Sequence, residues 1–239
     1  MITTAAKSVA AACGLALLAA FGGAAPTRAN GPPPGLAPAP KSRFCVTEGA
    51  LESSAEGRLS VNVAKLRAAL AGPGRQEIEA RFVYLGPTAE AAPLRSGAIR
   101  RQFGLKLRAA DGCNLIYAMW RFAPEPALVV SVKTNPGLHA SRACGAAGYR
   151  NVAPRRQAPV EAPEIGVPHR LAAALDGEAL RVRIDGKEVW EGEVGYDALA
   201  VDGPVGIRSD NVRLELELFA APTTAQDACP KVGGAAPEE

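Results

Sequence analysis

Apolar and charged residues alternate along the last third of the chain. Residues 180–184 read LRVRI and residues 212–218 read VRLELEL. A period of two places one kind of side chain on each face of a strand, so both segments are predicted to be half-buried strands. Asp185-Gly186 follows the first segment and predicts a type I′ hairpin turn, because these residue types tolerate positive φ angles. Such strands are typical of antiparallel sheets packed face to face.

Similar alternation predicts the remaining strands, which lie within residues 44–46, 57–63, 76–85, 98–109, 127–134, 169–175 and 187–191. Residues 113–122 are apolar on both faces, which indicates a central strand or one that lines a ligand groove. Residues 64–71 have helical propensity but are too short to hold a helix alone. Residues 135–167 show no periodicity, and loops of that length are usually functional or disordered. The predicted fold class is all-β, an antiparallel two-sheet β-sandwich.

The first 29 residues have the layout of a secretory signal peptide. Lys7 precedes an apolar run over residues 9–21, and small residues lead up to a predicted cleavage after Ala29. The run is shorter than the roughly 20 residues that a membrane span needs. A lipoprotein that uses Cys13 is a weaker alternative, because the residues before Cys13 lie too early in the apolar run. We expect an exported protein, periplasmic or extracellular, whose mature chain has no transmembrane span.

Composition divides the rest of the chain into three parts. We expect a Pro/Gly-rich linker over residues 30–42, a β-sandwich domain over residues 43–220 and a C-terminal tail over residues 221–239. The plentiful alanine is typical of GC-rich bacterial coding. The formal net charge is +3, and loss of Lys7 and Arg28 with the signal peptide would leave 25 basic and 24 acidic residues. This balance gives no electrostatic reason to expect a nucleic-acid partner.

Four cysteines remain once the predicted signal peptide is removed. An even number in an exported chain predicts two disulfides, for which three connectivities exist. We expect Cys113–Cys144, which would tie a loop to the start of a strand, and Cys45–Cys229, which would join the two ends of the domain. The spacing contains no Cys-x-x-Cys or Cys/His cluster, so zinc and thioredoxin-like sites are excluded.

The segment HRLAAALDGEALRVRIDGKEVWEG, followed by GPVGIRSDNVRLELELF, resembles the closing meander of the concanavalin A-like lectin/glucanase superfamily. The resemblance covers residues 169–219 and is nearest to the laminin-G-like and 3-keto-disaccharide hydrolase-like branches. It implies a jelly-roll β-sandwich. It implies less about function, because the superfamily includes lectins, glycosidases and adhesion domains.

Two carboxylate pairs meet the simplest requirement of a glycosidase. Glu77 with Glu79, and Glu215 with Glu217, each share one strand face at about 7 Å. Both pairs alternate with arginines, however, which favours solvent-facing ion pairs. His139 and His169 are the two histidines, which leaves few ways to build a Ser/His/Asp triad, and the resemblance implies a structural role for His169. No catalytic residue is therefore predicted.

A sugar platform is the stronger hypothesis for a site. Aromatic rings stack on the apolar face of a pyranose, while amides and guanidinium groups bond its hydroxyls. The predicted ligand-binding residues are Asn114, Trp120 and Arg121 on the central strand, with Tyr149, Arg150 and Asn151 from the long loop. The alternative is that Trp120 is a core residue, as aromatic residues in sandwich strands usually are. Trp120 and Tyr117 point to opposite faces, so they cannot line one groove together.

No cofactor is predicted, although Ser209-Asp210-Asn211 offers three side-chain oxygens for Ca²⁺. The same tripeptide is also an ordinary turn sequence. The expected function is non-catalytic binding of a glycan or a glycosylated surface. The alternatives are a hydrolase that acts on a sugar derivative and a structural envelope or adhesion module. The sequence makes no prediction of oligomeric state.

Overall fold

The computed structural model describes residues 1–2, 31–54, 56–72, 74–222 and 229. Its contacts divide the chain after Gly31, and the fold below is that of the unit that begins at Pro32. The predicted signal peptide and its cleavage site lie almost wholly outside the described residues. Within the described part of the chain, no helix has both the length and the apolar character to cross a membrane.

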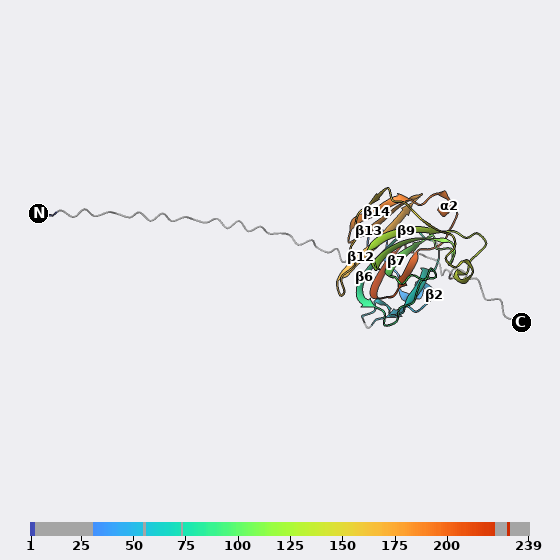
Figure 1. Ribbon diagram of the computed structural model, residues 1–239, viewed down its shortest axis with the longest axis horizontal. Coiled ribbons are helices and arrows are strands. Elements are labelled where there is room, and N and C mark those ends of the chain that lie inside the picture. Colours follow the sequence, from blue (N-terminus) through green and yellow to red (C-terminus); the bar gives the residue numbers. More distant parts are fainter. Residues whose placement is uncertain (3–30, 55, 73, 223–228, 230–239) are drawn as a thin grey trace. The chain divides into compact units, whose positions relative to one another are not determined.

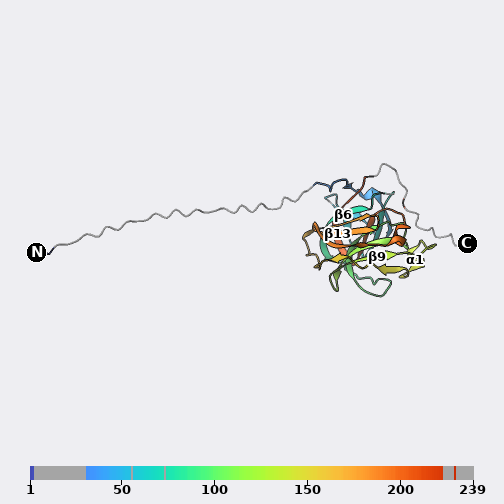
Figure 2. The same ribbon diagram turned by 90° about the horizontal axis from the view of Figure 1, so that it is seen from above.

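The described residues form two antiparallel sheets that pack as a sandwich (Figures 1 and 2), which confirms the predicted fold class. The nine-stranded sheet has the order β11-β14-β13-β12-β6-β16-β4-β3, with β1 beside β16. Its strands are β1 (Ala37–Pro38), β3 (Glu52–Ser53), β4 (Leu59–Val61), β6 (Glu77–Pro87), β11 (Arg156–Gln157), β12 (Pro168–Asp176), β13 (Ala179–Ile184), β14 (Lys187–Glu193) and β16 (Val212–Ala220).

The seven-stranded sheet has the order β10-β9-β8-β7-β15-β5-β2. Its strands are β2 (Phe44–Glu48), β5 (Lys65–Leu70), β7 (Arg101–Leu107), β8 (Leu115–Ala123), β9 (Ala127–Lys133), β10 (Tyr149–Asn151) and β15 (Gly206–Asp210). Three short helices complete the described elements: η1 (Lys41–Arg43), α1 (Ser141–Cys144) and α2 (Tyr196–Leu199).

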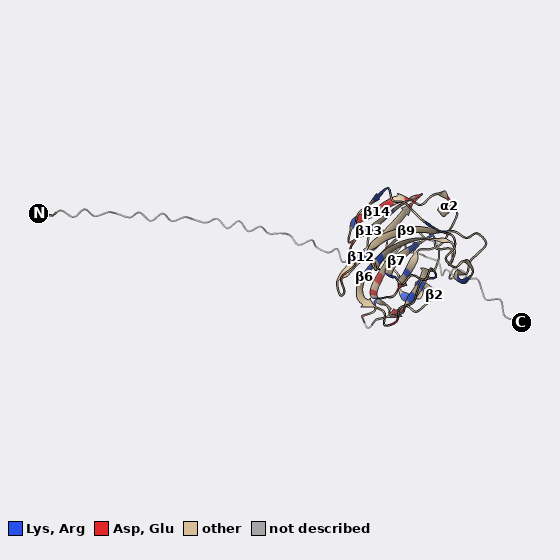
Figure 3. Cartoon of the chain, viewed as in Figure 1, with Lys and Arg blue, Asp and Glu red and all other residues tan. Residues whose placement is uncertain are grey.

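The core lies between the inner faces of the two sheets. Phe82 on β6 packs against rings from the facing sheet, with its centroid 5.0 Å from Phe103 and 5.8 Å from Trp120. Val182 and Leu214, two of the alternating apolar residues, are fully buried. Arg181 and Arg183, which flank Val182 on β13, are exposed, and Figure 3 shows charged residues along β13 and β14 of the nine-stranded sheet.

The Asp185-Gly186 turn has the backbone that the sequence predicts. Asp185 has φ 51° and Gly186 has φ 82°, and this pair of positive angles is what a type I′ turn requires. The Asp185 carboxylate accepts a hydrogen bond from the backbone of Arg170 and lies 2.8 Å from Nδ1 of His169. The turn is therefore fastened to β12.

Residues 64–71 have helical propensity, but in the structure residues 65–70 form strand β5. Leu66, Ala68 and Leu70 are buried on the core side, and β5 pairs with both β2 and β15. Tertiary pairing outweighs the intrinsic preference of so short a segment. Strand β1 pairs with β16 within the segment expected to be a linker.

Both predicted disulfides are present. Cys113–Cys144 has a Cα–Cα distance of 5.9 Å and ties α1 to the start of β8. Cys45–Cys229 has a Cα–Cα distance of 5.4 Å and ties a residue of the expected C-terminal tail to β2. Both predicted connectivities are confirmed.

Candidate functional site

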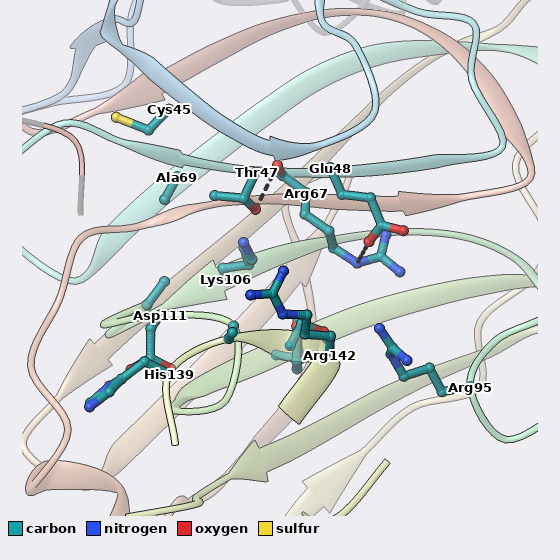
Figure 4. A pocket seen from close by; sticks show the side chains of 15 residues that line it. Cys45, Thr47, Glu48, Arg67, Ala69, Arg95, Lys106, Asp111, His139 and Arg142 are labelled. Atoms are coloured by element: carbon teal, nitrogen blue, oxygen red, sulfur yellow. Dashed lines mark hydrogen bonds and ion pairs between the residues drawn. The ribbon is translucent and has the colours of Figure 1, made fainter. Parts of the chain in front are cut away.

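A groove lies on the outer face of the seven-stranded sheet. Two cavities of about 260 Å³ and about 270 Å³ share five lining residues and so adjoin: Glu48, Arg67, Arg95, Tyr117 and Ser141. Figure 4 shows the first cavity, with side chains from several strands gathered around it. We call the two cavities together the groove.

Strand register explains why these side chains meet. Lys106 on β7 pairs with Tyr117 on β8, and Arg208 on β15 pairs with Arg67 on β5. Successive side chains of a strand point to opposite faces of the sheet. The sequence neighbours of these four residues are buried on the core face, so the four side chains lie on the outer face. The residues 93–96 and 139–142 add side chains above the sheet.

The groove is strongly basic. Its seven basic lining residues are Lys65, Arg67, Arg95, Lys106, Lys133, Arg142 and Arg208, whereas its two acidic ones are Glu48 and Asp111. The excess of five positive charges exceeds the net charge of +3 on the whole sequence. Positive charge is therefore concentrated in the groove.

A buried carboxylate fixes two of the guanidinium groups. Asp210 is fully buried and accepts hydrogen bonds from Arg67 Nη2 at 2.6 Å, Arg208 Nε at 2.9 Å and Gln102 Nε2 at 2.6 Å. Burial alone would raise the pKa of Asp210, but Arg208, Arg67 and these hydrogen bonds hold it below its usual value. Asp210 stays ionised and orients both arginines.

Two tyrosines stand beside the arginines. The rings of Tyr117 and Tyr149 stack with centroids 6.1 Å apart, and the Arg208 guanidinium carbon lies 4.9 Å from the Tyr117 centroid. Burial is the main cause that raises the pKa of Tyr117 to about 12, so its phenol keeps its proton. Tyr149 is 42% exposed, whereas Tyr117 is 3% exposed. Tyr149 is thus the aromatic ring open to a ligand.

Two buried lysines complete the lining. Lys106 donates to the carbonyl of Ala68 at 3.4 Å, and burial, followed by Arg67 and Arg208, lowers its pKa to about 7. Lys133 donates to the carbonyls of Gly112 at 3.1 Å and Gly145 at 3.0 Å. Burial, followed by Arg208, lowers the pKa of Lys133 to about 8. Neither lysine forms an ion pair with a described carboxylate.

Asp111 fixes one edge of the groove, which we call the rim and which includes Asn114 and His139. Its Oδ1 accepts from the backbone N–H groups of Cys113 and Asn114, and its Oδ2 lies 2.7 Å from Nδ1 of His139. Asn114 donates in turn to the carbonyl of Leu138. Together with the Cys113–Cys144 disulfide, these bonds fix the loop that carries α1.

Comparisons with known proteins identify the fold. No protein-family model and no curated protein matches the sequence. The carbohydrate-binding module CBM66 from Bacillus subtilis matches in structure with a TM-score of 0.50, at 12% identity, over 73% of this chain and 91% of the module. The fold is that of concanavalin A-like lectin/glucanase sandwiches.

Two further solved structures match less well. A protein with a galectin-like fold from Bacillus subtilis has a TM-score of 0.45, at 13% identity, over 75% of this chain and 88% of that protein. A galectin from Caenorhabditis elegans has a TM-score of 0.39, at 10% identity, over 76% of this chain and 99% of the galectin.

The six predicted ligand-binding residues lie in several different places of the sandwich. Tyr149 is the one of the six that lines the groove. Trp120 is 2% exposed in the core, where it packs on Phe82, and its Nε1 donates to the carbonyl of Glu161. Asn114 bonds Asp111 and the Leu138 carbonyl at the rim.

The remaining three predicted residues lie away from the groove lining. Arg121 donates to the carbonyl of Glu125. Arg150 bonds the Val194 carbonyl and the carboxylate of Asp197. Asn151 is exposed on the edge strand β10. The structure does not bring the six together.

Sequence reasoning missed four groove residues: Arg67, Lys106, Lys133 and Arg208. Each looks like an ordinary outward charge on an amphipathic strand, and Arg67 stands in a segment with helical propensity. They come from four strands, so no spacing in the sequence relates them. One signal pointed to the region: residues 113–122 were expected to be central or to line a ligand groove, and Tyr117 stands there.

Two of the three oxygen-bearing side chains in Ser209-Asp210-Asn211 are already engaged and are not free to hold a calcium ion. The Asp210 carboxylate already bonds two guanidinium groups and an amide. Asn211 bonds the backbone of Ala92 and Arg100 through its amide group. In the described residues, no three His, Cys, Asp or Glu side chains gather where a metal ion could be held.

The candidate glycosidase pairs lie on strands of the nine-stranded sheet. Glu79 lies 2.7 Å from Arg81 Nε, and Glu77 lies 2.8 Å from Arg75 Nη2. Glu217 pairs across strands with Arg81 in the ladder. These carboxylates are outside the lining of the groove.

Proposed function

We propose that this protein binds carbohydrate in the groove and does not itself catalyse a reaction there. The observation that carries the proposal is the half-exposed ring of Tyr149, stacked on Tyr117 and bordered by arginines and lysines. The C–H groups on one face of a pyranose ring pack on such an aromatic surface. Its hydroxyl oxygens accept hydrogen bonds from guanidinium groups, each of which has five donors and no acceptor. A concave site of this kind is where a small ligand is expected to bind.

The acidic residues of the groove favour binding over glycosidic hydrolysis. Hydrolysis requires two carboxylates on opposite sides of the scissile bond, about 5 to 9.5 Å apart. Of the two acidic lining residues, Asp111 has a side chain only 6% exposed, and its carboxylate already accepts hydrogen bonds from the backbone of Cys113 and Asn114. Glu48 is 46% exposed and forms an ion pair with Arg67, at 3.8 Å from Nε, and no described second carboxylate of the groove lining stands free to work with it.

We infer that the protein works outside the cytoplasm. Its two disulfides support this inference, because disulfides form and persist in oxidising compartments. The CBM66 module, which has the same fold, is named for carbohydrate binding, so the fold accommodates such a role.

A glycan-array screen of the purified exported protein tests the proposal. We expect binding to a subset of glycans, and Tyr149→Ala should lower the affinity by about tenfold or more, because a buried aromatic contact contributes one to several kcal/mol. Tyr196→Ala is the matched control, since Tyr196 is 80% exposed on α2 and does not line the groove. The absence of any glycan binding, or wild-type affinity in Tyr149→Ala, contradicts the proposal.

A further inference from the structure

We propose that the groove selects anionic glycans, and that a carboxylate or sulfate group of the sugar binds the ammonium group of Lys106. The inference rests on the proposed function and names the class of sugar that the same groove binds. Its basis is a buried cation that faces the groove without a described anionic partner.

Lys106 is held in an unusual position. It points from β7 into the groove and is 4% exposed. Its partner on the β15 side is Gly206, and the missing side chain there lets Lys106 reach across β15 to the carbonyl of Ala68 on β5. An ammonium group has three N–H donors. Among the described residues, the Ala68 oxygen at 3.4 Å is the one hydrogen-bond partner of Nζ.

The groups around Lys106 do not neutralise it. Burial is the main cause that lowers the pKa of Lys106 to about 7. The positive charges of Arg67 on β5 and Arg208 on β15 are the next two causes and act in the same direction. Asp210 supplies one negative charge to these two guanidinium groups and is bonded to both. Glu48 on β2 opposes the shift but is the weakest of the four causes. The uncharged phenol of Tyr117 stands beside Lys106 on β8.

This arrangement favours an anion over a neutral sugar. An uncompensated buried charge is costly, and a bound anion removes that cost while it fills the free N–H donors. A neutral hydroxyl fills the donors but leaves the charge uncompensated. Arg95, Arg142 and Lys133 extend the positive surface along the groove, which suits a polymer with repeated negative charges.

Matched polymer pairs test the inference by isothermal titration calorimetry at low salt and pH 6, where Lys106, with a pKa of about 7, is mostly protonated. The first pair is polygalacturonate and its fully methyl-esterified form, and the second pair is dextran sulfate and dextran. We expect the charged member of at least one pair to bind about tenfold or more tightly than the neutral member, because a hydrogen bond between two charged groups is stronger than one to a neutral hydroxyl. The two pairs distinguish carboxylate from sulfate.

Lys106→Met keeps the volume of the side chain and removes the charge. We expect this variant to lose that preference, so that it binds the charged and the neutral member of each pair with similar affinity. Lys187→Met is the control, because Lys187 is an exposed lysine in the hairpin of the nine-stranded sheet. Thermal unfolding of each variant confirms that the binding data come from folded protein.

The outcomes separate the two proposals. Equal affinity for the charged and neutral members overturns the anionic selectivity and leaves carbohydrate binding in place. Binding to none of the polymers or array glycans overturns both. Equal binding of polyglutamate, a polyanion without sugar, overturns the glycan assignment, and wild-type selectivity in Lys106→Met overturns the role of Lys106.

Discussion

Arg67 donates a hydrogen bond from Nη2 to Oδ1 of Asp210 at 2.6 Å, and this contact joins neighbouring strands at the base of the groove. The carboxylate is fully buried, and Arg208 bonds its other oxygen. One buried negative charge therefore positions two cations that border the groove. Removing a single partner from such a pair leaves an uncompensated charge in a poorly solvated place.

We expect Asp210→Asn to lower the free energy of unfolding by about 3–5 kcal/mol, because both arginines lose their buried counter-charge. Urea denaturation measures the change. Asp197→Asn is the control: Asp197 pairs with Arg150 at the surface, where the side chains are 55% and 46% exposed. Exposed pairs contribute about 0–1 kcal/mol, so the control should be nearly neutral. Equal losses in the two variants would contradict the special role of Asp210.

The buried Lys106 predicts a dependence of stability on pH. Its pKa falls from 10.5 to about 7 on folding, so between these values the unfolded chain binds more protons at this site than the folded chain. The free energy of unfolding then rises with pH across this window. Below pH 7 the folded protein keeps a buried ammonium ion and bears its full cost.

Lys106→Met removes this contribution. We expect the variant to be more stable than the wild type near pH 6 and the advantage to shrink as the pH approaches 10. Lys133, with a pKa lowered to about 8, acts in the same direction in both proteins and cancels in the comparison. Urea denaturation at several pH values measures the difference. A difference that stays constant with pH would show that Lys106 does not titrate in this range.

The strands were predictable because their signal is local. Leu180, Val182 and Ile184 alternate with arginines within five residues, and the burial of β13 follows that alternation. Strand β5 was not predictable from its own residues, since its extended form depends on pairing with β2 and β15. Local pattern thus determines most strands, and long-range pairing determines the rest.

The groove is formed by residues that are far apart in the sequence and meet only through the pairing of strands. Arg67 and Asp210 are 143 residues apart in sequence and meet because β15 inserts between β5 and β7. The sequence correctly assigned Tyr117 and Trp120 to opposite faces of β8. It did not determine which face is the core, because the strand is apolar on both.

The Cys113–Cys144 disulfide connects stability with binding. It closes a loop of 31 residues and fastens α1, whose Ser141 and Arg142 line the groove. We expect Cys113→Ser with Cys144→Ser to lower the free energy of unfolding by about 2–5 kcal/mol. Glycan affinity should also fall, because the rim residues lose their fixed position. Differential scanning calorimetry and the polymer titrations measure the two effects, and an unchanged thermal midpoint would contradict the structural role.

Trp120 provides the sharpest contrast with Tyr149, because both were predicted ligand residues and the structure places them differently. Trp120 packs in the core on Phe82 and Phe122 and donates to the Glu161 carbonyl at 2.9 Å. Trp120→Phe keeps an aromatic ring there, loses this hydrogen bond and leaves a small cavity. We expect the variant to lose about 1–3 kcal/mol of stability and to keep the glycan affinity of the wild type.

Tyr149→Phe is the matched substitution in the groove. It removes the phenol oxygen that accepts a hydrogen bond from Arg208 at 3.3 Å, at a ring that is 42% exposed. Its cost in stability should be small, and its effect on glycan affinity should be larger than that of Trp120→Phe. Calorimetric titration and urea denaturation of the two variants separate the roles. A loss of affinity in Trp120→Phe that matches the loss in Tyr149→Phe would place the ligand near the core tryptophan instead of the groove.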